Sequence, residues 1–218
     1  MISRLIFRYY VQSMKFVLLL AGFLSISIAN DCAEGQVLVE TKCYNQNDLE
    51  ILVEFADSSN LFINNPDLDI NDKYEYAINM GEQVWDETTR LTNWTYWVGS
   101  PSLQLKFIPS NIGDLTNLIY LDLSNNNFSG PIPESIGNLT SLNTLDLTSA
   151  DFSGPIPESI GALTSLNTLD LARNDLSGPV PQNIGDLTNL IYLDLSNNNF
   201  SGPITESSGN LTSLNTLD

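Results

Sequence analysis

The chain has 218 residues, of which 26 are acidic and 8 are basic, so its formal net charge is −18. This charge argues against binding to nucleic acids or to anionic membranes, because both need surfaces rich in Lys and Arg. The chain has no histidine, which removes the usual general base, the usual catalytic triads and the usual zinc ligands.

Residues 1–29 have the features of a secretory signal peptide. Three basic residues precede an apolar stretch over residues 16–28, and a small-residue cleavage site ends at Ala29. A membrane anchor is the alternative, but the apolar stretch is shorter than the roughly 18–20 residues that a spanning helix needs. We therefore expect a secreted or cell-surface protein without a stable membrane span after cleavage.

Cys32 and Cys43 are the only cysteines of the chain. In an exported chain, a close pair predicts a disulfide that closes a small loop, worth about 3 kcal/mol on loop entropy. Two free thiols are the alternative, and a redox role is disfavoured because the spacing is not Cys-x-x-Cys. We place this loop in an N-terminal capping region over residues 30–90.

Residues 48–58, DLEILVEFADS, predict a short helix within this region. Asn47 is expected to cap it, with Glu50 as the acid of a capping box. The helix would present one apolar stripe, made of Leu49, Leu52, Val53 and Ala56. We expect this stripe to cover the open edge of the structure that follows.

Residues 64–72 form a polar stretch in which Asp67, Asp69 and Asn71 alternate as in a calcium-binding loop. The glycine expected at the sixth position is Asp72, and the glutamate expected at the twelfth is Ile78. These departures favour a solvated turn over a metal site, and we predict no metal or other cofactor.

Residues 115–218 repeat with a period of 24. Successive units begin at Leu115, Leu139, Leu163, Leu187 and Leu211. A fixed period in this range is typical of a solenoid, whose units pack only on their neighbours. We expect four full repeats over residues 115–210 and a truncated repeat over 211–218.

A degenerate first repeat is predicted over residues 91–114. LTNWTYWVG from Leu91 aligns with LTNLIYLDL from Leu115, which places Trp94 and Trp97 at leucine positions. The later pairs Ile108-Pro109 and Ile112-Gly113 also recur 24 residues on. Large, irregular residues suit a terminal repeat that caps the array.

Each unit contains the pattern of a short strand with one buried face. Leu121 and Leu123 alternate with Tyr120, Asp122 and Ser124. The Gly and Pro residues that follow stop any helix or central strand. One unit cannot bury its apolar edge alone, so the units are expected to stack and to pair their strands in a parallel sheet.

Asn126, Asn174 and Asn198 occupy the corner after the strand. An amide both donates and accepts, so a column of them can satisfy the backbone of adjacent turns. Ala150 holds this place in the second unit and cannot do so, which predicts a local weak point.

These units resemble the plant-type leucine-rich repeat, LxxLxxLxLxxNxLSGxIPxxIGx. The resemblance implies a right-handed solenoid of α/β type, with a parallel sheet on the concave face, irregular or 3-10 segments on the convex side and a small helical N-terminal cap. The segment CAEGQVLVETKCYNQNDLEILVEF is also similar to the start of secreted bacterial leucine-rich-repeat proteins. Members of the family are mostly extracellular recognition modules, although function does not follow from fold alone.

The residues that flank the strand leucines are expected to form a polar shelf on the concave face. This shelf suits a protein, peptide or glycan ligand, whereas solubility alone is the other explanation for its composition. The candidate ligand-binding residues are Tyr120, Asp122, Ser124, Thr144, Asp146, Thr148, Thr168, Asp170, Arg173, Tyr192, Asp194 and Ser196.

Five aspartates occupy one position in successive units: Asp122, Asp146, Asp170, Asp194 and Asp218. Neighbouring strands lie about 4.8 Å apart, so the carboxylates should repel and their pKa values should rise, unless hydroxyls and amides donate to them. A divalent cation or a basic ligand would relieve the repulsion. A well-hydrated column screened by salt is the simpler alternative.

We favour a non-catalytic extracellular binding module over a structural or adhesive spacer. An enzyme is disfavoured because no acid pair stands apart from the repeats in a pocket-like setting. Residues 113–146 recur as 185–218 with two differences, and the sequence stops inside a strand. We expect a fragment of a longer protein, or an edge that self-associates or is covered by a partner.

Overall fold

A computed structural model describes residues 32–34, 36–39, 42–58, 82–87, 90–96, 106–203 and 206–218. The expected signal peptide, the polar stretch at 64–72 and Trp97 lie outside these ranges. Within them, no helix combines the length and the apolar composition that crossing a membrane requires.

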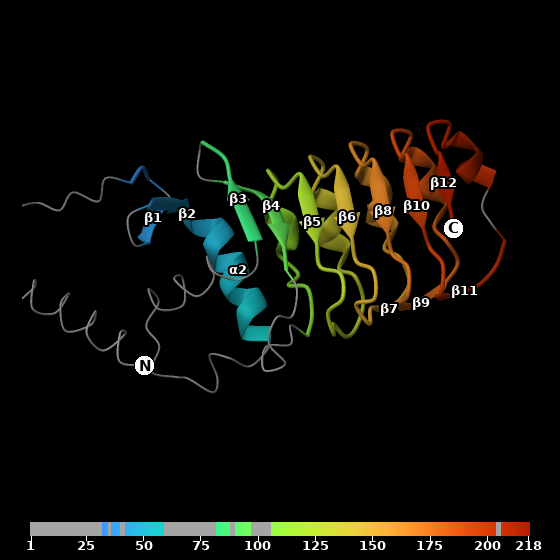
Figure 1. Cartoon of the computed structure of the whole chain (residues 1–218), viewed down its shortest axis with the longest axis horizontal. Coiled ribbons are helices and arrows are strands. Elements are labelled where there is room, and N and C mark those ends of the chain that lie inside the picture. Colours follow the sequence, from blue (N-terminus) through green and yellow to red (C-terminus); the bar gives the residue numbers. More distant parts are fainter. Residues whose placement is uncertain are drawn as a thin grey trace, which may run out of the picture. The chain divides into compact units, whose positions relative to one another are not determined.

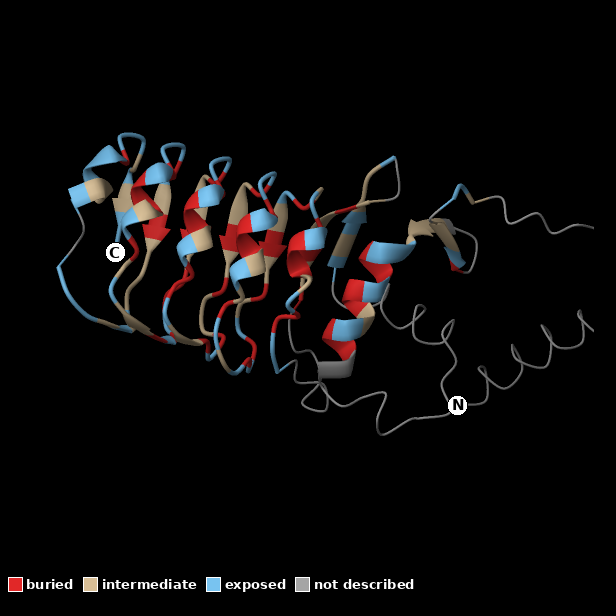
Figure 2. Cartoon of the chain, turned by 180° about the vertical axis from the view of Figure 1, so that it is seen from behind, coloured by how far each residue is buried: buried red, intermediate tan, exposed pale blue. Residues whose placement is uncertain are grey.

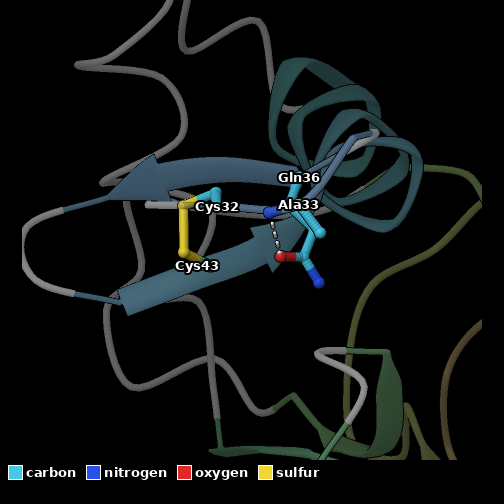
Figure 3. Close-up of a disulfide and its surroundings, with 4 residues drawn as sticks. All are labelled: Cys32, Ala33, Gln36 and Cys43. Atoms are coloured by element: carbon cyan, nitrogen blue, oxygen red, sulfur yellow. Dashed lines mark hydrogen bonds between the residues drawn. A yellow bond between two sulfur atoms is a disulfide. The ribbon is translucent and has the colours of Figure 1, made fainter. Parts of the chain in front are cut away.

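The described chain begins with a β-hairpin that a disulfide cross-links to the residues before it (Figure 3). Strands β1 (Gln36–Val39) and β2 (Lys42–Asn45) pair antiparallel. Cys32, just before β1, is bonded to Cys43 in β2, with 5.5 Å between their Cα atoms. The predicted disulfide is therefore confirmed, whereas the hairpin itself was not predicted.

Helix α2 (Gln46–Ser58) follows the hairpin directly and starts earlier than expected. The side chain of Asn45, and not that of Asn47, accepts a hydrogen bond from the backbone N–H of Asp48 (3.2 Å). Glu50 accepts instead from the side chain of Gln46, one turn back. The cap prediction was wrong by two residues because another Asn stands at the true helix start.

The apolar stripe of α2 packs on the first strand of the repeat array. The rings of Phe55 and Trp94 meet edge to face with their centroids 4.7 Å apart. The predicted stripe is buried, with Val53 half-buried, and Ile51 and Phe55 join it. The helix thus covers the edge of the array, as predicted.

One sheet of seven strands organises the described part of the chain (Figure 1). Its order is β12-β10-β8-β6-β5-β4-β3. The bounds are β3 Glu82–Trp85, β4 Leu91–Thr95, β5 Tyr120–Asp122, β6 Thr144–Asp146, β8 Thr168–Asp170, β10 Tyr192–Asp194 and β12 Thr216–Leu217. All neighbours from β4 to β12 are parallel, whereas β3 is an antiparallel addition that precedes the first repeat.

The strands of successive repeats pair residue on equivalent residue, 24 apart. Leu121 lies beside Leu145, and Leu145 beside Leu169. Each of these leucines is fully buried, while the residues on either side of it are half-buried. The alternation read from the sequence therefore sets which side chains enter the core.

The first coil departs from the predicted register. Trp94 lies beside Leu121, 27 residues on, and not at the position of Leu118. Tyr96 is consequently buried, and its backbone N–H bonds to Asp122 O (2.9 Å). This register places the Trp94 ring in the core against Phe55. It also leaves three more residues between the strand and Ile108 than the next repeat has between its strand and Ile132.

The chain returns from each strand through irregular backbone and a 3-10 helix. These helices are η1 Ile112–Asp114, η2 Glu134–Asn138, η3 Glu158–Ala162, η4 Gln182–Asp186 and η5 Glu206–Asn210. A second, three-stranded sheet joins the coils between strand and helix, made of β7 Ser153–Gly154, β9 Asp175–Gly178 and β11 Asn199–Phe200. The predicted 3-10 side of the solenoid is confirmed.

The predicted asparagines lie at the corners after β5, β8 and β10 and bond to the backbone of adjacent coils. The Asn174 amide donates to Leu147 O, Leu171 O and Ala172 O, and its oxygen accepts from the N–H groups of Ala150 and Phe152. Ala150 lacks such an amide, but its backbone carbonyl accepts from Phe128 N (2.9 Å). Asp151, with φ of 61°, adopts the left-handed backbone that accompanies this substitution. The structure thus compensates part of the expected weak point.

A continuous apolar core runs from α2 through the coils. It includes Phe55, Trp94 and a leucine or isoleucine ladder, with Phe128 stacked on Phe152 at 4.9 Å. Figure 2 shows the buried residues along the strands and the return segments. The last coil is largely exposed and η5 has no buried residue; Ser208 there occupies the position at which Ile136 and Ile184 are buried.

Candidate functional site: the open face of the repeat sheet

The candidate site is the side of the large sheet that faces away from the core. We call it the open face and define it by the residues that flank the central residue of each strand, which is Trp94 in β4 and a leucine in the later strands. The strand pairing aligns them in two rows. The first row is Asn93, Tyr120, Thr144, Thr168, Tyr192 and Thr216, and the second is Thr95, Asp122, Asp146, Asp170, Asp194 and Asp218.

The predicted residues after the strands extend these rows at the same edge. Asn125 N bonds to Thr148 O, and Arg173 N to Ser196 O, so the coils remain in register beyond the aspartates. Arg173 is exposed and has a positive φ of 56°, and the equivalent residues of the other three full repeats have φ values of 53–54°. Strand pairing and these backbone bonds thus align the sequence-predicted binding residues from coil to coil.

Each aspartate from Asp122 to Asp194 is anchored to its own backbone. One carboxylate oxygen, Oδ1, accepts the N–H two residues on, from Ser124, Thr148, Ala172 and Ser196, at 2.8–3.0 Å. This turn fixes the carboxylate beside the strand end and satisfies one of its oxygens. The second oxygen, Oδ2, is left for a hydroxyl, for water or for a ligand.

Asp146 and Asp194 have opposite pKa shifts although they occupy equivalent positions. Burial raises the pKa of Asp146, and the charges of Asp122 and Asp170 add to this rise, which hydrogen bonds from Thr148 oppose. Burial also acts to raise the pKa of Asp194, but hydrogen bonds from Ser196 and Tyr192 and the charge of Arg173 lower it overall. The pKa of Asp146 therefore rises as predicted, with burial as the larger cause, and Asp194 shows the predicted exception, because its donors outweigh burial.

Two tyrosines face these carboxylates. Tyr120 Oη donates to Asp122 Oδ2 at 3.5 Å, and Tyr192 Oη to Asp194 Oδ2 at 3.3 Å. Desolvation, together with the charges of Asp170 and Asp194, raises the pKa of Tyr192 to about 12. Desolvation and nearby aspartates also raise the pKa of Tyr120. Both hydroxyls therefore stay protonated at neutral pH and serve as donors.

The structure adds residues that the sequence analysis did not assign to this face. Strand β3 places Glu82 beside Thr95 and Val84 beside Asn93, which extends both rows by one strand. Ile119 and Ile191, just before the two tyrosines, are 46% and 43% exposed. An Ile-Tyr pair ahead of the strand leucine, present in two of the four repeats, was the available signal for the isoleucines.

The repeat array carries very few positive charges. Over residues 106–218 the sequence has two basic residues, Lys106 and Arg173. Within the described residues, no three side chains of the metal-binding type gather as a metal site would require. Chemically, the open face offers evenly spaced carboxylates, hydroxyls and two aromatic rings to a ligand that runs across the strands.

Comparisons with known proteins give the family. The profile described as Leucine Rich Repeat matches residues 117–139, 141–163, 165–187 and 189–211. No curated protein matches the chain at a significant level.

Solved structures of plant receptor ectodomains resemble the chain. The SOBIR1 receptor kinase ectodomain from Arabidopsis thaliana is 33% identical, with a TM-score of 0.61 over 80% of this chain and 92% of that one. The GASSHO1/SCHENGEN3 ectodomain from Arabidopsis thaliana, solved with CASPARIAN STRIP INTEGRITY FACTOR 2, is 38% identical, with a TM-score of 0.53 over 60% of this chain. The Arabidopsis HAESA ectodomain, solved with an IDA peptide hormone, is 45% identical, with a TM-score of 0.50 over 52% of this chain.

The matched region spans 16% of the GASSHO1/SCHENGEN3 chain and 19% of the HAESA chain, so these receptors are far longer arrays. The SOBIR1 ectodomain, by contrast, is matched over nearly its whole length. The repeat profile, the stacked parallel strands and this likeness together show that the chain belongs to the leucine-rich-repeat proteins, with repeats of the plant type.

Proposed function

We propose that this chain is a non-catalytic extracellular recognition module that binds a peptide, or an extended segment of a protein, on the open face of its sheet. The observation that carries the proposal is the register of the repeats. It lines up two rows of polar and aromatic side chains over six strands, from β4 to β12. A repeated surface of this kind matches the repeated backbone of an extended ligand.

The comparisons support a peptide as ligand. HAESA is solved with an IDA peptide hormone, the plant peptide hormone receptor RGFR1 with RGF2, and GASSHO1/SCHENGEN3 with CASPARIAN STRIP INTEGRITY FACTOR 2. The Cys32–Cys43 disulfide supports an oxidising, extracellular location. On this basis residues 1–29 are a signal peptide, residues 30–90 a cap and residues 91–218 the binding array.

The test is selection of binders from a random peptide display library on the purified protein, followed by binding to two matched double variants. Thr144→Arg with Thr168→Arg places two bulky side chains on the open face. Thr140→Arg with Thr164→Arg makes the same change at exposed turns four residues earlier. We expect the selected peptides to lose binding to the first variant and to keep it with the second.

Binders that tolerate the open-face variant and fail with the turn variant would place the site elsewhere on the solenoid. A library that yields no binder would count against recognition of peptides altogether.

A further inference from the structure

The open face carries two copies of one cluster, three coils apart. Ile119, Tyr120 and Asp122 form the first, and Ile191, Tyr192 and Asp194 form the second. In each, the tyrosine hydroxyl bonds to the aspartate, and the isoleucine is exposed. The two coils between them carry Asn and Thr in place of Ile and Tyr, so the clusters stand out from the polar rows.

The spacing of the clusters follows from the strand register. Tyr120 pairs with Thr144, Thr144 with Thr168, and Thr168 with Tyr192. Three steps between neighbouring strands, at about 4.8 Å each, separate the two tyrosines by about 14 Å. An extended peptide advances about 3.3 Å per residue, so this separation corresponds to about four residues.

The chemistry of each cluster suits a cationic side chain. The carboxylate supplies charge, the tyrosine ring offers a face on which an ammonium or guanidinium group can lie, and the exposed isoleucine can cover the aliphatic stem of Lys or Arg. Asp122 and Asp194 are each bonded to their own backbone through Oδ1, so they are held in place before any ligand arrives.

The two clusters differ in their surroundings. The charges of Asp170, Asp194 and Asp218 all act on Tyr192, which marks the second cluster as strongly negative. Arg173 lies close enough to lower the pKa of Asp194, so it competes with an incoming cation there. The pKa of Tyr120 is raised by desolvation and by the charges of Asp122 and Asp146, so the first cluster is negative as well.

We propose that the two clusters are paired subsites for basic side chains four residues apart in an extended peptide. This rests on the proposed function and narrows its ligand class. Charge complementarity favours a basic peptide on this face. The chain has a net charge of −18, and Arg173 is the one cation at this edge of the described face, so acidic partners are repelled.

The test uses three capped nine-residue peptides of Ser, Thr and Gly, measured by calorimetry on the full chain at low salt. One has Lys at positions 3 and 7, one has Lys at positions 3 and 5, and one has a single Lys at position 3. We expect the first to bind about tenfold more tightly than the other two, because only it engages both subsites at once. Equal affinity for the 3,7 and 3,5 peptides would overturn the proposal.

Variants then locate the subsites. Tyr120→Ala and Tyr192→Ala should each lower the affinity for the 3,7 peptide to that for the single-Lys peptide. Thr140→Ala and Thr164→Ala, at the exposed turns used as controls above, should leave it unchanged. Arg173→Ala should strengthen binding at the second cluster. Tyrosine variants that behave like the threonine variants, with the fold verified by circular dichroism, would also overturn the proposal.

The outcomes separate this inference from the proposed function. Library binders that depend on the open face but lack paired basic residues would refute the proposed subsites for basic side chains. They would leave the proposed peptide recognition intact. Absence of any open-face binder would remove both.

Discussion

At the scale of single residues, the glycines of the 3-10 segments show what the repeat unit demands. A Cβ placed on Gly137 or Gly161 would lie 2.4 and 2.6 Å from a backbone oxygen of the next coil. Backbone atoms of a packed neighbour cannot move aside as a flexible side chain can. These positions therefore require glycine for the close approach of coils, which the sequence shows only as a recurring Ile-Gly pair.

We predict that Gly161→Ala lowers the free energy of unfolding by about 3 kcal/mol, the upper end of what overpacking costs. Its Cβ would collide with Asn183 O. Gly209→Ala is the matched control, because the equivalent position in the last coil has nothing within 4 Å. Alanine there should be neutral or slightly stabilising, since it favours helical backbone. Urea unfolding measures the stability of both variants. An equal loss of unfolding free energy in the two variants would refute the explanation by contact between coils.

The corner asparagines mark a limit of residue-level prediction. The pattern correctly placed Asn174 against the backbone of two coils, because its donor and acceptor match the unpaired groups there. It did not foresee that the Ala150 carbonyl would accept the Phe128 N–H, with Asp151 in the left-handed region. Backbone rearrangement of this kind leaves no trace in a side-chain pattern.

At the scale of elements, the strands of the array were predictable and the cap was predicted only in part. The leucine alternation marks each strand, and the stripe of α2 marks its buried face. Strands β1, β2 and β3 are four residues each, too short for a clear alternation, and they pair antiparallel with near neighbours in the sequence. The register of Trp94 was missed because it depends on the Phe55 ring of α2, not on the 24-residue period.

An ion pair that the sequence does not reveal fastens α2 to the array. Asp48 is fully buried, and its carboxylate accepts from Arg90 Nε at 2.9 and 3.0 Å and from the backbone N–H of Leu91 at 2.8 Å. Arg90 also donates to Asp114 O in the next coil. The two partners are 42 residues apart, so no local pattern connects them.

We predict that Arg90→Gln destabilises the protein by about 3–5 kcal/mol, because it leaves the buried Asp48 carboxylate without its cation. The double variant Asp48→Leu with Arg90→Met should recover much of this loss, since it removes both charges. Lys106→Gln is the control for removing a positive charge elsewhere and should change stability little. Chemical unfolding measures all three, and a double variant no more stable than Arg90→Gln would contradict this account.

At the scale of the whole molecule, the period determined most of what could be foreseen. It gave the stacked strands, the buried leucines and the rows of the open face, because each coil repeats the previous one. The period could not predict differences between coils, such as the opposite pKa shifts of Asp146 and Asp194. Those arise from burial, which dominates at Asp146, and from the donors around Asp194, first Ser196 and then Tyr192, with the charge of Arg173 adding to them.

Because of these differences, the aspartates of the row should contribute differently to the pH dependence of folding stability. The pKa of Asp146 is raised in the folded state, so this carboxyl favours folding while protonated, and its contribution falls as pH rises from the unfolded pKa through the folded one. The pKa of Asp194 is lowered, so its contribution is present above the unfolded pKa and is lost as pH falls through the folded pKa.

At pH 7 we therefore predict opposite effects from one substitution at two equivalent positions. Asp146→Asn should raise the melting temperature, because it removes a charge disfavoured by burial and by Asp122 and Asp170 while keeping an Oδ1 acceptor for Thr148 N. Asp194→Asn should lower it, because the hydrogen bonds from Ser196 and Tyr192 and the charge of Arg173 favour the carboxylate at this position. Both changes should shrink when salt screens the row. Scanning calorimetry at low and high salt measures them, and shifts of the same sign would show that net charge alone, rather than each coil's neighbours, governs the row.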